Sequence, residues 1–154
     1  MNYYLGFLNA LPLSIFMWIL VLFLWITRQI DRVDENSKKM FIIDLKDNGW
    51  FFRKTFEERG FVAFGFGNVI LVKDIEQARK NRILKHEAEH CLQCYKLSLF
   101  FPILYVLDSA RIYFFIKDQH PYYDNVFEIQ ARAAANQQLV IPKSQWKLDR
   151  TFFW

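Results

Sequence analysis

The sequence contains few cysteines and few glycines, the residues typical of disulfide-rich proteins and of phosphate-binding loops. Two cysteines in 154 residues do not make the disulfide framework of a small secreted domain. The five glycines form no Gly-rich phosphate loop, and there is no RNA-binding signature or basic-aromatic stripe. The formal net charge of +4 is too small to indicate nucleic acid as a partner, although it would suit an anionic membrane surface.

Charge is absent from the first 27 residues, which include no Asp, Glu, Lys or Arg. Tyr4 to Thr27 is a mostly apolar run, long enough for one helix to cross the hydrocarbon core of a bilayer. The run lacks the basic start, the shorter apolar stretch and the small-residue cleavage site of a signal peptide. We therefore predict a single-pass transmembrane anchor over residues 1–27, with membrane lipid as its partner.

Basic residues follow this apolar run and precede the rest of the chain. They are Arg28, Arg32, Lys38 and Lys39. The positive-inside rule then predicts a cytoplasmic location for the chain after the anchor, with the amino terminus outside. Residues 28–39 are charged and poor in apolar side chains. We interpret them as a linker between the anchor and a domain over residues 40–154.

Within residues 40–154 the hydrophobic pattern predicts an α+β fold. Met40 to Leu45 and Phe61 to Val72 favour strands, and a turn or bulge at Gly65 to Asn68 interrupts the second run. Apolar spacing predicts a helix from Ile75 to about Leu97 and a later helix from Val126 to Leu139. The expected domain therefore has a short sheet followed by helices.

A second long apolar stretch extends from Leu97 to Ile116. Its length resembles that of a transmembrane helix, but Asp108 and Arg111 lie one turn apart within it. Charged side chains at membrane depth are costly. We interpret the stretch as a buried or membrane-facing helix of the domain.

The run His86-Glu87-Ala88-Glu89-His90 has the pattern H-E-x-x-H and lies in the helix predicted from Ile75. Two histidines four residues apart project from one helix face and can bind one metal ion. Glu87 lies about 100° round the helix from His86, beside the metal. A base is needed there to take a proton from metal-activated water. The pattern predicts a zinc hydrolase site.

Catalytic zinc requires a third protein ligand and leaves one coordination position open for water. Glu128 in the later helix would complete a His2Glu set, and the alanines that follow it would let this helix approach the first closely. Three further residues are candidates for this position. His120 precedes Pro121 in a predicted loop, Cys94 lies one turn beyond His90, and Glu89 is expected to point elsewhere and to be solvated.

Three side chains are candidates to stabilise an oxyanion that develops during hydrolysis. His120, Tyr122 and Tyr123 lie just before the predicted Glu128 helix, and each has a side chain that can donate a hydrogen bond. The residue types also allow a structural interpretation, in which His120 is an ordinary surface residue and the two tyrosines are an aromatic packing pair.

The motif and the downstream glutamate resemble the gluzincin metallopeptidases, especially their minimal single-domain forms. The matching residues are His86, Glu87, His90 and Glu128, and the resemblance covers roughly residues 60–135. It implies a zincin-like domain with one zinc ion per chain that hydrolyses peptide bonds in a polypeptide substrate. Arg132 departs from the pattern, because an acidic or small residue often stands there, so the hydrogen bonding of the ligand histidines is left open.

Two further functions remain open from the residues alone. One is a membrane-anchored interaction protein that keeps the zincin fold without activity. The second is a metal-binding or redox module that uses Cys91 and Cys94, which have C-x-x-C spacing. A single such pair is weak as a zinc motif, because structural zinc sites normally take four protein ligands.

Overall fold

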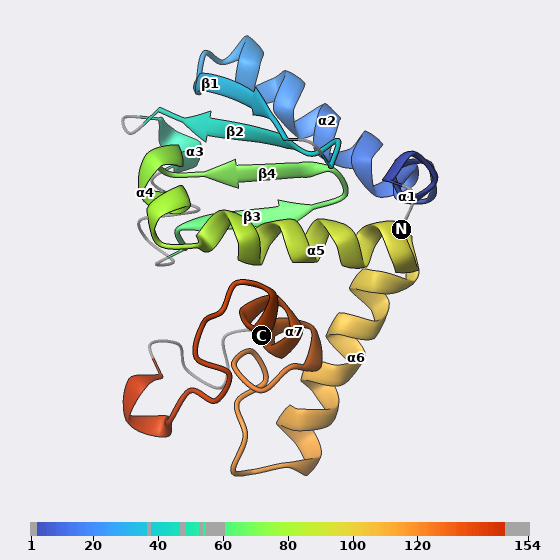
Figure 1. Ribbon diagram of the computed structural model, residues 1–154, viewed down its shortest axis with the longest axis vertical. Helices are drawn as coiled ribbons and strands as arrows, with labels where there is room; N and C mark the ends of the chain where they lie inside the picture. The colour runs from blue at the N-terminus through green and yellow to red at the C-terminus, as the bar shows by residue number, and fades with distance from the viewer. Residues whose placement is uncertain (1–2, 37, 47–48, 53, 55–60, 147–154) are drawn as a thin grey trace.

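The computed structural model describes residues 3–36, 38–46, 49–52, 54 and 61–146. The described chain has an α+β fold around a four-stranded mixed sheet (Figure 1). The strands are β1 (Ile30–Glu35), β2 (Phe41–Leu45), β3 (Ala63–Phe66) and β4 (Val69–Val72), in the order β1-β2-β4-β3. Strand β2 is parallel to β4, and the other two pairs are antiparallel.

The strands predicted over residues 40–45 and 61–72 are present, and a turn joins β3 to β4 as expected. Gly67 in this turn has a φ of 62°, a left-handed conformation that glycine adopts without a steric penalty. A Cβ atom on Gly67 would also lie 2.8 Å from the backbone nitrogen of Ser14. The turn therefore requires glycine at position 67 both for its conformation and for its close contact with the backbone of Ser14.

Helices cover both faces of the sheet. Helix α2 (Leu11–Ile26) packs on one face, where Met17, Val21 and Leu24 meet alternate residues of β2 and β4. Helices α4 (Ile75–Lys80) and α5 (Ile83–Leu97) cover the other face. All four residues of β4 are buried, as expected for a central strand that is covered on both sides.

The apolar segment predicted as one anchor forms two helices, α1 (Tyr3–Asn9) and α2, with a bend of 75° between them. Pro12 lies in the first turn of α2 and has no backbone N–H to continue a helix from α1. Among the described residues, no one helix combines the length and the apolar character needed to cross a bilayer. Two bent pairs of helices have the required length and apolar character only when the two helices of a pair are counted together: α1 with α2, and α5 with α6 (Phe100–Phe115). The single-pass anchor and its orientation stay predictions.

The segment interpreted as a linker, residues 28–39, contains strand β1, so this interpretation was wrong for its central part. Strand β1 pairs with β2 from Ile30 opposite Leu45 to Glu35 opposite Phe41. It is an edge strand, and most of its side chains are at least partly exposed. Charged residues are common on such edges, because they prevent pairing with another chain.

The helix predicted from Ile75 to Leu97 divides into α4 and α5. Asp74 caps the start of α4, where its side chain accepts hydrogen bonds from the backbone N–H groups of Glu76 and Gln77. Arg82, between the two helices, has a φ of 61°, which a continuous right-handed helix does not permit. Helix α5 therefore begins at Ile83 and contains the whole H-E-x-x-H pattern.

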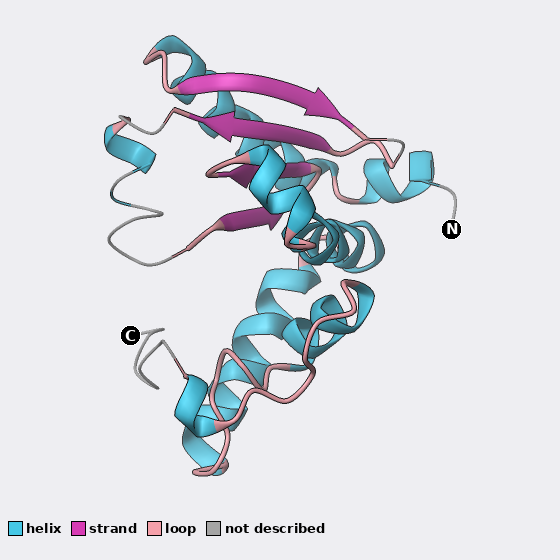
Figure 2. Cartoon of the chain, turned by 60° about the vertical axis from the view of Figure 1, so that its left-hand side comes forward, coloured by secondary structure: helices cyan, strands magenta, loops and turns pink. Residues whose placement is uncertain are grey.

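The remaining elements lie on the side of α5 away from the sheet, as Figures 1 and 2 show. They are α6 (Phe100–Phe115), α7 (Val126–Ala134) and a 3-10 turn, Lys143–Gln145. The short helix α3 (Trp50–Phe52) is separate from this group and follows β2. The stretch from Leu97 to Ile116 is largely helical, and Arg111 forms an ion pair of 2.9 Å with Asp108. Helix α7 ends at Ala134 and not at Leu139, because Asn136 has a left-handed φ of 52°.

Candidate metal centre

Helices α5 and α7 pack against each other and carry the residues predicted as metal ligands. Asn125 caps α7, where its Oδ1 atom accepts from the backbone N–H of Phe127. Its amide nitrogen donates to the backbone oxygen of Tyr105 and to the hydroxyl of Ser109, so the start of α7 is tied to α6. Within α7, Ala131 is fully buried, as expected for a close approach of the two helices.

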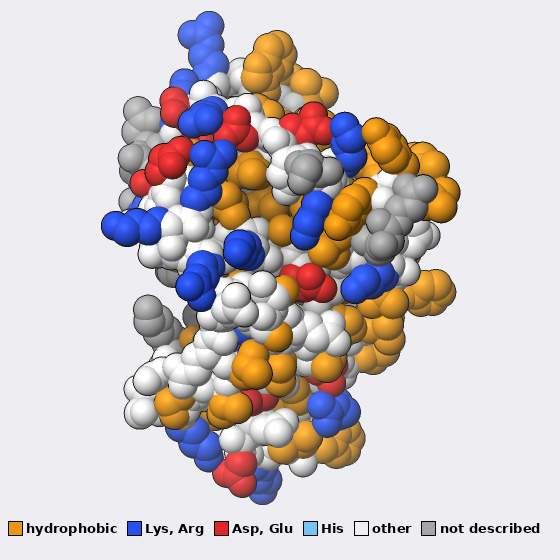
Figure 3. Space-filling view, viewed as in Figure 1, with side chains coloured by type: hydrophobic (Ala, Val, Ile, Leu, Met, Phe, Trp, Pro, Cys, Tyr) orange, Lys and Arg blue, Asp and Glu red, His pale blue; other side chains and the backbone are white. Residues whose placement is uncertain are grey.

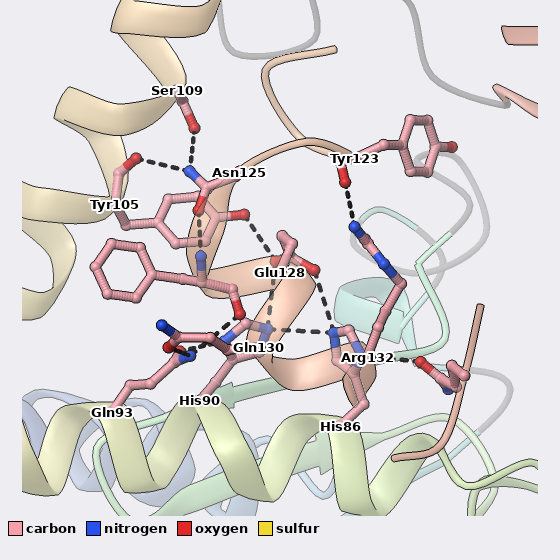
Figure 4. Close-up of polar contacts among 12 residues, drawn as sticks. His86, His90, Gln93, Tyr105, Ser109, Tyr123, Asn125, Glu128, Gln130 and Arg132 are labelled. Carbon is pink, nitrogen blue, oxygen red and sulfur yellow. Dashed lines mark hydrogen bonds and ion pairs between the residues drawn. The ribbon is translucent and has the colours of Figure 1, made fainter. Parts of the chain in front are cut away.

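His86, His90 and Glu128 form one compact, buried group. Figure 4 shows both imidazoles rising from α5 towards the carboxylate of Glu128 on α7. The two Nε2 atoms are 3.2 Å apart, and each lies 3.2 Å from a different oxygen of Glu128. Two ligands of one tetrahedral zinc ion are separated by about 3.3 Å, given metal–nitrogen distances of about 2.0–2.1 Å. The group therefore has the spacing of a three-ligand zinc site.

The hydrogen bonds of Gln93 determine which nitrogen of His90 faces Glu128 with a lone pair. The amide nitrogen of Gln93 donates to the backbone oxygen of Phe127, which can only accept. The Oε1 atom of Gln93 therefore faces the Nδ1 atom of His90, at 2.9 Å, and this nitrogen must carry a proton. A neutral His90 then directs the lone pair of Nε2 into the group, which is the form that binds metal.

Gln137 has the same relation to His86, with its Oε1 atom 3.1 Å from Nδ1. Each ligand imidazole thus has one glutamine behind it. The sequence did not predict these two glutamines. It raised only the question of what bonds to the histidines if Arg132 does not. Arg132 is buried, and it donates to the backbone oxygens of Tyr123 and Leu139 instead of contacting the histidines. It holds the chain on both sides of α7 in place.

The charges of this group favour an ion pair in the absence of metal. Burial acts to lower the pKa of His90, but the hydrogen bond and the negative charge of Glu128 outweigh it and raise that pKa to about 9. Burial acts to raise the pKa of Glu128, but the hydrogen bonds from His86 and His90 hold it well below its usual range. The positive charge of His90 therefore compensates the buried carboxylate. Apart from its ion pair with Nε2 of His86, at 3.2 Å, Oε2 of Glu128 has no hydrogen-bond partner in the described structure. A divalent cation would satisfy it.

Glu87 lies beside the ligands in a pocket of 230 Å³ between β3, α5, α6 and α7. The three ligand residues line this pocket too, and most of its other walls are apolar, including Phe64 and Phe101. Burial raises the pKa of Glu87 above its usual value, against the opposing charges of the two histidines. A carboxylate with a raised pKa is a better proton acceptor from water than an ordinary one.

Of the three predicted oxyanion stabilisers, Tyr122 lines the pocket. Burial and then the charges of Glu128 and Glu87 raise the pKa of Tyr122 well above its usual value, so its phenol keeps its proton. Tyr105 also lines the pocket, and its hydroxyl donates to Oε1 of Glu128 at 2.8 Å. This tyrosine was not predicted from sequence, because it comes from α6 and reaches the ligand only through the packing of α6 on α7.

The structure does not bring His120 or Tyr123 to the pocket. His120 is fully buried, and its Nδ1 atom accepts from the backbone N–H groups of Tyr122 and Tyr123, at 3.1 and 3.4 Å. The ring of Tyr123 stacks on Trp146. Both residues therefore shape the loop that presents Tyr122, and His120 is not a plain surface residue either.

Glu89 and Cys94, which the sequence also allows as third ligands, lie apart from the group. Glu89 is partly exposed and pairs with Lys96, and the thiol of Cys94 accepts from the backbone N–H of Gly67. Cys91 and Cys94 are free, buried thiols, and burial raises the pKa of both, that of Cys94 to about 12. Within the described residues, the one group of three or more ligand side chains close enough to hold a metal is His86, His90 and Glu128.

No protein-family model, curated protein or solved structure matches the chain. The function is therefore inferred from the site itself. The site has three converging ligand side chains, a buried carboxylate beside them and an apolar pocket that all four residues line. The residues present suit a divalent metal ion, and nothing in the donor set distinguishes zinc from other metals that favour imidazole and carboxylate ligands.

Proposed function

We propose that this chain is a zinc-dependent peptidase of the gluzincin type. The observation that carries the proposal is the buried group of His86, His90 and Glu128 with Glu87 in the same pocket. The first three residues would hold the metal. When bound, zinc supplies Lewis acidity that makes a water molecule nucleophilic at neutral pH.

In this mechanism Glu87 handles the proton. Its raised pKa suits a group that accepts a proton from the attacking water and returns it to the leaving amine. Tyr122 keeps its phenolic proton and can donate a hydrogen bond to the carbonyl oxygen as negative charge develops there. The hydroxyl of Tyr105 is engaged with Glu128 and orients the carboxylate.

The surroundings of the pocket support a polypeptide substrate. Strand β3 is at the end of the strand order, next to the pocket that Ala63, Phe64 and Gly65 help to line. An extended peptide can pair with such an edge through main-chain hydrogen bonds. The apolar walls formed by Phe101 and Val106 would then favour an apolar side chain next to the bond that is cleaved.

The test is a comparison of metal content and peptide cleavage in four proteins. The wild type should bind about one zinc ion per chain, as one catalytic site implies. Glu128→Ala should lose the metal and the activity. Glu87→Gln should retain zinc and lose about 10²- to 10⁴-fold in kcat, the usual contribution of a general base.

The matched control is Glu89→Gln, on the same helix but partly exposed and paired with Lys96. It should retain both zinc and activity. Full activity of Glu87→Gln would contradict the mechanism, and a wild type that binds no zinc would contradict the proposal as a whole. Loss of activity on substitution of Cys91 or Cys94, with Glu87→Gln unaffected, would point to the cysteine pair instead.

A further inference from the structure

The described surface carries an extensive set of exposed apolar side chains on three helices. Six residues that are each more than half exposed represent it: Leu5 and Leu8 on α1, Phe16 and Ile19 on α2, and Phe100 and Leu107 on α6. Figure 3 shows hydrophobic side chains gathered along the right-hand edge of the molecule, where α1 and α6 lie in Figure 1. We call the exposed apolar side chains of α1, α2 and α6 the apolar surface. Monomeric soluble proteins rarely expose apolar patches of this kind.

Hydrogen bonds join the parts of this surface that are far apart in sequence. The side chain of Asn9, at the end of α1, donates to the backbone oxygens of Tyr95 and Lys96 near the end of α5. The hydroxyl of Ser98, just before α6, donates to the backbone oxygen of Asn9. The end of α1 and the start of α6 are therefore held close together.

The inner face of α2 is already occupied, because Leu13, Met17, Val21 and Leu24 pack inside the molecule. Its outer face, including Phe16 and Ile19, is apolar and carries no charge. A helix with one face on a sheet and an apolar outer face can lie in the plane of a membrane interface. Helix α6 also has one face inside the molecule, with Phe101 and Ile112 buried and Phe100, Ile103 and Leu107 exposed. Its exposed Arg111 lies one turn beyond Leu107 and forms an ion pair with Asp108.

Aromatic and basic side chains border the apolar surface. Tyr3 and Tyr4 begin α1, Trp25 is 67 % exposed at the end of α2, and Arg28 follows it. Lys39 lies 5.8 Å from the ring centre of Tyr4 and pairs with Glu35, and Lys96 is exposed beside Asn9 and pairs with Glu89. Tyrosine and tryptophan favour the boundary between lipid and water, and lysine and arginine favour anionic headgroups. We therefore take an anionic bilayer as the partner that this border fits.

We propose that α1, the outer face of α2 and α6 together insert into one leaflet of an anionic phospholipid bilayer, with the described chain on a single side of the membrane. This differs from a single-pass anchor in two ways. In our proposal α6 contacts lipid as α1 and α2 do. Both ends of the amino-terminal apolar segment, Tyr3 and Ile26, lie on the same side of the membrane. The proposal is independent of zinc or peptidase activity.

The first experiment measures flotation of the full-length chain with vesicles of phosphatidylcholine alone or with phosphatidylserine. The wild type should float with the anionic vesicles and at least several-fold less with neutral ones. The triple variant Ile103→Gln, Leu107→Gln, Phe115→Gln should bind at least tenfold more weakly. The matched control Val33→Gln, Leu139→Gln, Val140→Gln changes three exposed apolar residues outside α1, α2 and α6, and it should bind like the wild type. Circular dichroism establishes that both variants are folded.

A second measurement avoids multiple substitutions. Leu107→Cys and Val140→Cys, each labelled with an environment-sensitive fluorophore, should differ: vesicles should shift the emission of the first to shorter wavelength and leave the second unchanged. Cys91 and Cys94 are buried and should not react with the label. In sealed vesicles, an amino-terminal tag and a Lys143→Cys label should be accessible from the same side.

Several outcomes would overturn the proposal. Accessibility of the tag and of residue 143 from opposite sides would indicate a single-pass anchor. Equal flotation of wild type and the α6 variant would show that α6 does not contact lipid, and equal binding to neutral and anionic vesicles would exclude the headgroup contribution. A wild type that forms stable dimers in solution and does not float would assign the apolar surface to a second copy of the chain.

Discussion

The two ligand histidines differ in how their supporting glutamines are held. Gln93 lies on the same helix as His90, is almost fully buried and bonds to the backbone of α7. Gln137 is partly exposed, follows the end of α7, and reaches His86 across 3.1 Å. Hydrogen bonds behind a ligand imidazole select its tautomer and its orientation. The more accessible glutamine is therefore the better site for a test of this role.

We expect Gln137→Ala to lower zinc affinity by about 10- to 100-fold, the usual effect of removing a hydrogen bond behind a metal ligand. The fold should be preserved, because Gln137 lies outside a helix and is partly exposed. Gln138→Ala is the matched control, since Gln138 is the adjacent, exposed glutamine. Competition with a zinc chelator measures both affinities. Equal affinities in the two variants would exclude this role for Gln137.

The pKa of His90 predicts how metal binding depends on pH. In the metal-free protein that pKa is raised to about 9, so the imidazole is charged at neutral pH and must lose a proton to bind zinc. Zinc affinity should therefore rise by about tenfold per pH unit up to about pH 9. Calorimetry in buffers with different ionisation enthalpies should detect the released proton at pH 7. Zinc binding without proton release would contradict the charged state of His90.

The same shift makes the metal-free protein less stable at high pH. The pKa of His90 is higher in the folded chain, about 9, than its ordinary value of 6.5. The stabilisation from its charged form is therefore complete below pH 6.5 and is lost as the pH rises to about 9.

The sequence indicated the ligand set, because i and i+4 spacing places two histidines on one helix face. It did not indicate these charges, which depend on burial between α5 and α7.

At the scale of elements, the position of α7 determines whether Glu128 meets the histidines. The capping side chain of Asn125 also joins this helix to Tyr105 and Ser109 of α6. We expect Asn125→Ala to reduce the free energy of unfolding by about 1–2 kcal/mol, as for other lost helix caps, and to weaken zinc binding as well. Thermal unfolding and chelator competition measure the two effects.

Asp74→Ala is the matched control for this prediction. Asp74 caps α4, which carries no ligand, through two backbone N–H groups. Its loss should reduce stability by a similar amount, about 1 kcal/mol, and leave zinc affinity unchanged. Equal zinc affinity in Asn125→Ala and the wild type would mean that the cap does not position Glu128.

The strands and helices differ in how far the sequence predicted them. Strands β2, β3 and β4 are apolar, so their composition reveals them, even though β3 is an edge strand with Phe64 exposed. Strand β1 is mostly polar, and its formation depends on pairing with β2, which no local pattern shows. The break between α4 and α5 depends on the backbone of Arg82, an ordinary helix former by composition. Sequence patterns therefore identify apolar elements better than a polar edge strand or the ends of helices.

Helix α6 contributes residues both to the apolar surface and to the pocket. Pro102 and Val106 line the pocket, while the neighbouring residues Ile103 and Leu107 are exposed on the same helix. If the bilayer covers the exposed face of α6, the pocket opens close to lipid. A substrate that partitions into the bilayer then reaches the pocket at a higher local concentration than one that stays in water.

We therefore expect anionic vesicles to raise the cleavage rate of a peptide with an attached acyl chain by about tenfold or more, since effective concentration near a surface can increase association by such factors. A soluble peptide with the same cleavage sequence should be cleaved at the same rate with and without vesicles. The α6 triple variant should lose the vesicle effect and retain its basal rate, because none of its three substituted residues lines the pocket. Equal stimulation of the two peptides would mean that lipid acts on the conformation of the chain and not on access of the peptide to the pocket.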